Sequence, residues 1–188
     1  MPMQPFRNVR HRFTTTEYSQ LLQSGALAPD VRVELIRGEI MDIAPRNSGH
    51  ASAMAVLHER LAAVVQPLGH IRSAMPLVLD QRSQPEPDLA VVSARSDHYR
   101  DAHPTGQDAL LLIEVADQAL LYDRTIKASL YAAAHVPAVW IANLQAGELH
   151  CLSEPGACGY RQRVVLRRED RAALPAPFDA GIELAGVL

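Results

Sequence analysis

The first third of the chain has the pattern of a helix, a hairpin and a second helix. Residues 14–24 open with threonines and then place apolar residues at helical spacing, which predicts a short amphipathic helix with a threonine cap. Residues 32–43 alternate apolar and polar positions on both sides of Arg37-Gly38, which predicts a β-hairpin whose turn uses the glycine. Apolar residues recur every three or four positions over 50–66, which predicts the second helix.

Alternation in the hairpin also assigns its two faces. Val33, Leu35 and Ile40 are expected to pack inward, with Met41 as a further candidate. Glu34 is expected to face the other side.

The middle of the chain predicts strands separated by polar connections. Two short extended runs, 73–79 and 89–93, are joined by a polar, turn-rich segment. Pro85 and Pro87 in that segment cannot donate to a sheet ladder, so the second strand is expected to begin after them. Residues 108–116 contain a continuous apolar run, which is typical of a strand covered on both faces.

The last third predicts a helix, a buried strand, a hairpin and a tail. These are expected at 122–134, at 136–142 and at 148–168, with the hairpin turn at Pro155-Gly156. Helices and strands in this order predict an α/β protein with a mixed central sheet flanked by helices. Without repeats or a break in composition, residues 1–188 are expected to form one domain.

Composition excludes several classes of protein. The chain has 188 residues, a formal charge of −3 and 48% hydrophobic residues, as an ordinary globular protein does. No stretch approaches the roughly 20 apolar residues of a membrane span, and we expect a cytoplasmic protein. Cys151 and Cys158 lack the spacing of a zinc site. With an acidic net charge, any binding of nucleic acid must come from a local patch.

The basic residues are distributed unusually. Of the 18 Lys and Arg residues, only Lys127 is a lysine. Either a coding bias toward arginine left one surface lysine by accident, or this position requires a lysine. Composition alone does not decide between the two.

Three acidic residues stand where packing would not place them: Glu34 in the hairpin, Asp88 before a strand and Glu114 at the end of an apolar strand. A buried carboxylate costs several kcal/mol unless it is paired or binds a metal. Oxygen ligands of this kind suit Mg²⁺ or Mn²⁺. Each also has an ordinary explanation. Glu34 could lie on a solvated hairpin face, Asp88 could cap a turn after Pro87, and Glu114 could accept hydrogen bonds from helix N-terminal amides.

The helix after Glu114 supplies a cation. Lys127 and Tyr131 lie four residues apart and so share one helix face. The connection from Glu114 is short, so Lys127 can converge with Glu114 and Asp88. The alternatives are a surface ion pair between Lys127 and Asp123, and a Tyr131 that lies at the edge of the core.

Five segments in order resemble the Uma2 family, formerly a domain of unknown function (DUF820), within the PD-(D/E)XK nuclease superfamily. They are residues 32–40 (RVELIRGEI), 87–92 (PDLAVV), 112–115 (LIEV), 122–127 (YDRTIK) and 130–141 (LYAAAHVPAVWI). The resemblance runs from about Phe13 to Trp140. It implies a restriction-endonuclease-like core.

The resemblance also implies roles for the acidic residues. Asp88 and Glu114 match the metal ligands, the Val115 carbonyl is a candidate third ligand, and Glu34 matches the upstream acidic residue. The superfamily lysine would stand two residues after the Glu, but that position is Ala116. Its place is taken by Lys127 on the next helix, where it would orient or deprotonate the attacking water.

Asp123 and Tyr131 match recurring family positions whose roles are less clear. His50 is interpreted as a helix residue near the site rather than as a ligand. Basic residues of the C-terminal hairpin either discourage sheet pairing at an edge or contact phosphate. They are Arg161, Arg163, Arg167, Arg168 and Arg171.

Two functional hypotheses follow. The first is a homodimeric endonuclease that uses Mg²⁺ or Mn²⁺ to hydrolyse phosphodiester bonds of nucleic acid, with DNA as the expected substrate. The second is a catalytically inactive, dimeric interaction or regulatory module that retains the nuclease fold.

Overall fold

The computed structural model of the chain describes residues 10–28, 30–116 and 126–188. Two helices and a hairpin come first: α1 (Thr15–Gln23), β1 (Val33–Ile36), β2 (Glu39–Asp42) and α2 (Ser48–Val65). The central elements are β3 (Gly69–Ser73), β4 (Leu89–Ser93), β5 (Ala109–Ala116), α4 (Ala128–Ala133) and β6 (Ala138–Asn143). The last are β7 (Glu148–Gly156), β8 (Gly159–Arg167), β9 (Arg171–Ala173) and β10 (Gly181–Glu183).

Within the described residues, six strands form the central sheet in the order β3-β4-β5-β6-β7-β8. Its one parallel pair there is β5 with β6, and the other neighbours are antiparallel. The predicted fold class, a mixed sheet flanked by helices, is therefore confirmed.

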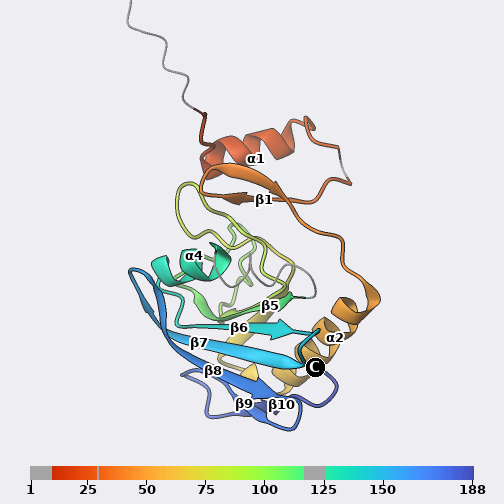
Figure 1. Cartoon of the computed structure of the whole chain (residues 1–188). Coiled ribbons are helices and arrows are strands. Elements are labelled where there is room, and N and C mark those ends of the chain that lie inside the picture. Colours follow the sequence, from red (N-terminus) through yellow and green to blue (C-terminus); the bar gives the residue numbers. More distant parts are fainter. Residues whose placement is uncertain (1–9, 29, 117–125) are drawn as a thin grey trace, which may run out of the picture.

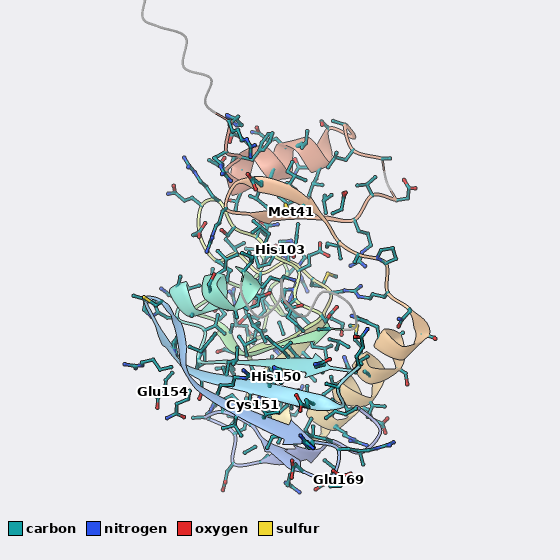
Figure 2. The ribbon with its side chains drawn as sticks, in the orientation of Figure 1. Met41, His103, His150, Cys151, Glu154 and Glu169 are labelled. Carbon is teal, nitrogen blue, oxygen red and sulfur yellow. The ribbon has the colours of Figure 1, made fainter. Side chains whose placement is uncertain are left out.

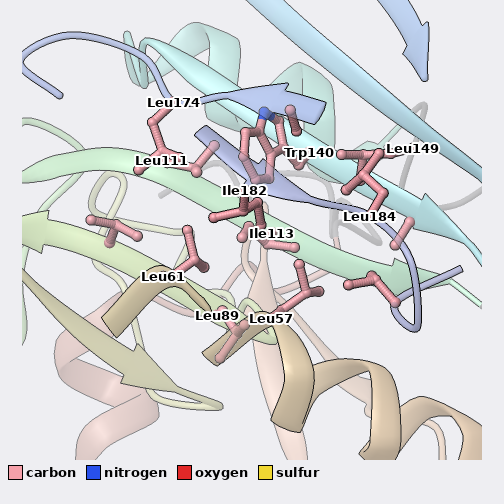
Figure 3. Close-up of a cluster of buried hydrophobic side chains, with 14 of the residues drawn as sticks. Leu57, Leu61, Leu89, Leu111, Ile113, Trp140, Leu149, Leu174, Ile182 and Leu184 are labelled. Atoms are coloured by element: carbon pink, nitrogen blue, oxygen red, sulfur yellow. The ribbon is translucent and has the colours of Figure 1, made fainter. Parts of the chain in front are cut away.

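The sheet separates two hydrophobic clusters. On one face, α2 and the β9–β10 pair pack against Leu111 and Ile113 of β5, and Figure 3 shows this cluster. The other face, which α4 covers (Figure 1), contains Leu112 and Ala116 of the same strand. The apolar run at 108–116 is thus covered on both sides, as predicted.

The N-terminal helix and hairpin are attached to this core through local geometry that the sequence specifies. Thr14 caps α1 and forms a capping box with Glu17. In the hairpin turn Arg37 and Gly38 have φ angles of 51° and 79°, and a Cβ on Gly38 would meet Arg12 at 2.8 Å. Backbone hydrogen bonds in both directions between Leu35 and Gln84 then join β1 to the segment that leads to Asp88.

The strand predicted at 73–79 is wrong in position. The ladder with β4 runs over Gly69–Ser73 and stops there. Ala74 has a φ of 50°, and Pro76 has no N–H to donate. Between Ser73 and the start of β4 at Leu89 the chain makes only isolated bridges, such as Val78 with Thr105.

The C-terminal hairpin turns later than predicted. Pro155 and Gly156 belong to β7 and pair with Tyr160 and Gly159, so residues 157–158 form the turn. Proline is tolerated because β6 begins opposite Ser153, which leaves the end of β7 with a neighbour on one side only.

Residues expected to be a tail contribute to the core. β9 pairs antiparallel with β10, and the segment buries Phe178, Ile182 and Leu184 against α2 and the sheet. Strands of three residues separated by two prolines have too short a pattern to be predicted from sequence.

One predicted core position is wrong. Met41 is exposed and lies on the N-terminal hairpin (Figure 2), whereas Val33 and Leu35 are buried as expected. Glu34 faces away from Leu35 but is also buried.

Two expectations from composition can be compared with the structure. Cys151 and Cys158 are both free cysteines. In the described ranges, no helix has the length and apolar character needed to cross a membrane.

The packing of α2 predicts an asymmetric response to leucine substitution. Leu57 is fully buried in the cluster of Figure 3, so Leu57→Ala should lower the free energy of unfolding by about 2–5 kcal/mol. Leu68 is 50% exposed, and Leu68→Ala should change the free energy of unfolding by less than about 0.5 kcal/mol. Urea unfolding followed by fluorescence of Trp140, the single tryptophan, measures both. Equal effects of the two substitutions would contradict this packing.

Candidate active site

The predicted acidic residues meet where β4 begins and β5 ends. Leu89 of β4 pairs with Ile113 of β5. One residue further in this antiparallel register, Asp88 stands opposite Glu114, a position at which Cβ atoms are typically about 4.5–5.5 Å apart. Two carboxylates 26 positions apart in sequence therefore lie on neighbouring strands at one end of the sheet.

Glu114 is bound by two residues from the start of the next helix. Lys127 Nζ lies 3.0 Å from Glu114 Oε1, and the Tyr131 hydroxyl donates to the same oxygen at 2.5 Å. Lys127 directly precedes α4 in helical conformation, and Tyr131 is four residues later, so both reach the strand from one face. Ala116 is buried among apolar residues, and the cation of the site comes from Lys127.

Glu34, on the N-terminal hairpin, also forms an ion pair with Lys127. Its Oε2 lies 3.3 Å from Lys127 Nζ and accepts the backbone N–H of Glu86 at 3.0 Å. Lys127 is only 5% exposed, and Glu34 and Glu114 are similarly buried. The geometry excludes both a solvated Glu34 and a surface position for Lys127.

Asp88 has a different set of partners. Arg46 donates to Oδ1 from Nε at 3.1 Å and from Nη2 at 2.8 Å. The Val115 backbone N–H donates to Oδ2 at 2.8 Å, and His50 Nε2 lies 3.0 Å from the same oxygen. Because the N–H and C=O of a strand residue point toward the same neighbour, the Val115 carbonyl also faces this side.

These contacts keep Asp88 ionised. Burial alone raises the pKa of its carboxyl, but hydrogen bonds from His50 and the Val115 amide, with the charges of His50 and Arg46, outweigh burial and lower it. An ionised carboxylate only accepts hydrogen bonds, so we assign an N–H donor to His50 Nε2. His50 Nδ1 is buried and has no hydrogen-bond partner in the described part of the chain.

Two residues of the site were missed from the sequence. Arg46 lies in the loop just before Asn47, the cap of α2, and such a loop position has no periodic signal. Glu86, between the two prolines, lies near Arg32, with Nη2 to Oε2 at 3.4 Å. Burial raises the pKa of Glu86 despite the opposing effect of Arg32. Asp123, which was predicted to support the site, lies outside the described residues.

The donor atoms fit a hard divalent cation in kind. Asp88, Glu114 and the Val115 carbonyl are oxygen donors, which Mg²⁺ and Mn²⁺ prefer. Both oxygens of Asp88, however, already accept N–H groups of the protein, and Glu114 Oε1 is bound by Lys127 and Tyr131. Among the described residues, no group of three or more His, Cys, Asp or Glu side chains is arranged to hold a metal ion.

Comparison with known proteins places the chain in a family. The model of Uma2, described as "Putative restriction endonuclease", matches residues 15–186. A solved structure described as "a putative nuclease belonging to DUF820", from Anabaena variabilis ATCC 29413, superposes with a TM-score of 0.69. It is 12% identical, over 94% of this chain and 99% of that chain, which shows a shared fold. Curated proteins give no match. Since the family match covers nearly the whole sequence, this chain belongs to the Uma2 family of restriction-endonuclease-like proteins.

Proposed function

We propose that the chain is a metal-dependent endonuclease that hydrolyses phosphodiester bonds of DNA in the cytoplasm. The observation that carries the proposal is the buried pairing of Lys127 with Glu34 and Glu114, next to Asp88 at the end of the neighbouring strand. Core residues do not need this arrangement, because burying charged groups without a functional reason is costly. Family membership favours the same activity.

Asp88 and Glu114, with the Val115 carbonyl, would hold Mg²⁺ or Mn²⁺. A divalent ion bound there supplies Lewis-acid activation of the phosphate and of the attacking water. Glu34 would hold Lys127 in place through their ion pair. Tyr131 would fix the carboxylate of Glu114 through its 2.5 Å hydrogen bond.

Lys127 would orient the attacking water. Its ammonium is held between carboxylates from β1 and β5, so its position is set by two elements. A lysine serves here better than an arginine because it is a compact point charge, whereas a guanidinium is a wide planar fork. A homodimer of such sites would present one to each strand of a duplex.

A non-catalytic dimeric module is the second candidate. It is favoured by the binding of Asp88 to Arg46 and His50, which occupy the carboxylate that a metal needs. The two candidates differ in metal binding and in turnover, and the following experiments separate them.

Replacing the lysine should abolish turnover. We expect Lys127→Ala and Lys127→Arg to lower the rate of plasmid nicking in Mn²⁺ about 100-fold or more, as loss of a positioned proton-transfer or water-orienting group does. Arg95→Lys is a matched exchange outside the site, because Arg95 pairs with exposed Asp97. It should leave nicking unchanged, and thermal melts establish that each variant is folded. Full activity of Lys127→Arg would disprove the role assigned to Lys127.

Metal binding should depend on Asp88. Titration with Mn²⁺, followed by the electron paramagnetic resonance signal of the free ion, should show a site that Asp88→Asn weakens at least about tenfold, as loss of a ligating charge predicts. Asp97→Asn is the matched control, since Asp97 also pairs with an arginine, on the surface. Mn²⁺ binding that is the same in all three proteins would favour the non-catalytic module.

A further inference from the structure

The carboxylate of Asp88 has no lone pair left for a new ligand. An ionised carboxylate offers about four acceptor positions, two on each oxygen. Oδ1 accepts two N–H groups from Arg46, and Oδ2 is bound by the Val115 N–H and His50. A cation that binds Asp88 must therefore displace one of these three partners.

The three partners differ in how firmly they are held. The Val115 N–H is backbone within β5 and cannot move without breaking the strand. The His50 side chain is 10% exposed and belongs to the first turn of α2. Arg46 precedes the helix, and its long side chain is 21% exposed, twice the value for His50. Arg46 is thus the partner that can leave at the smallest structural cost.

We propose that Arg46 is an exchangeable counter-ion: it holds Oδ1 of Asp88 in the metal-free protein and is displaced by the divalent cation, after which its guanidinium binds a phosphate group of the nucleic acid. The inference rests on the proposed function, because it assumes that Asp88 is a metal ligand. It assigns a substrate-binding role to a residue that the sequence pattern did not indicate.

Charge balance favours this exchange. Among the described residues, the site combines the carboxylates of Glu34, Glu86, Asp88 and Glu114 with the cations of Arg32, Arg46 and Lys127, and with His50. A divalent ion adds two positive charges to a nearly balanced set. Release of Arg46 toward solvent takes the positive charge of its guanidinium away from Asp88. An incoming phosphate then compensates that charge.

The chemistry of arginine suits both states. Its planar guanidinium donates two parallel hydrogen bonds to a carboxylate or to a phosphate with the same geometry. Here Nε and Nη2 already point to one oxygen of Asp88. The same two donors can therefore serve the phosphate after only side-chain rotation.

The exchange predicts opposite effects on two measured constants. Because Arg46 competes with the cation, Arg46→Ala should bind Mn²⁺ about tenfold more tightly than the unaltered protein, as the loss of one charge-assisted contact predicts. Because Arg46 binds phosphate, the same substitution should raise KM for plasmid about tenfold and change kcat by less than about threefold. Arg46→Lys keeps the charge with one contact, and should be intermediate in both.

Arg95→Ala is the matched control. Arg95 donates to Asp97 through Nε and Nη2 as Arg46 does to Asp88, but it follows the opposite end of β4, about 17 Å away along the strand. This control should change neither constant. Mn²⁺ binding by Arg46→Ala, measured without nucleic acid, is independent of turnover, and circular dichroism checks that the variant is folded. If it does not fold, Arg46→Lys carries the same test.

The outcomes separate this inference from the function on which it rests. If the unaltered protein binds Mn²⁺ and Arg46→Ala binds it equally well or more weakly, the exchange is overturned and the metal site stands. If neither the unaltered protein nor Arg46→Ala binds Mn²⁺ in a way that Asp88→Asn weakens, the exchange and the proposed metal site are overturned together. Tighter Mn²⁺ binding with an unchanged KM would overturn the phosphate-binding half of the proposal.

Discussion

The buried ammonium of Lys127 between Glu34 and Glu114 is the interaction on which the arrangement of the chain depends. Removing the ammonium would leave two carboxylates buried without their cation, and a broken buried pair costs about 3–5 kcal/mol. The three residues come from β1, β5 and the start of α4, which are far apart in sequence. Their pairing therefore fixes the hairpin, the central strand and the helix relative to one another.

Further hydrogen bonds around the ion pair stabilise the same arrangement of hairpin, strand and helix. The hairpin that carries Glu34 is also bound to residues 82–84 through backbone hydrogen bonds of Leu35 and Gly38, and Arg37 reaches the Ser129 hydroxyl of α4. Glu34 itself accepts the N–H of Glu86, two residues before Asp88. The segment with the two prolines is thus held from both sides, and Asp88 is presented at a defined point beside Glu114.

The sequence predicted the parts of the structure that have a periodic pattern or a conspicuous residue. The helix at 50–66, the apolar strand at 108–116 and the single lysine all belong to this group, and the structure brings Lys127 to Glu114. Arg46 was not predicted, because an arginine in a loop of an arginine-rich chain is inconspicuous until the fold places it on Asp88. The strand predicted at 73–79 lies at 69–73 for a similar reason, since the end of the strand depends on the backbone conformation of Ala74.

The choice of cation at each place follows from burial and geometry. At the closed centre, two carboxylates from different directions meet one small charge, which the ammonium of Lys127 satisfies and a planar guanidinium would not. At the more exposed side, one carboxylate oxygen accepts two N–H groups of Arg46, which a guanidinium supplies from a fixed fork. An arginine thus suits the Asp88 contact, whereas the place between Glu34 and Glu114 favours a lysine. The single lysine of the chain therefore stands at the more buried of the two ionic contacts, and an arginine stands at the less buried one.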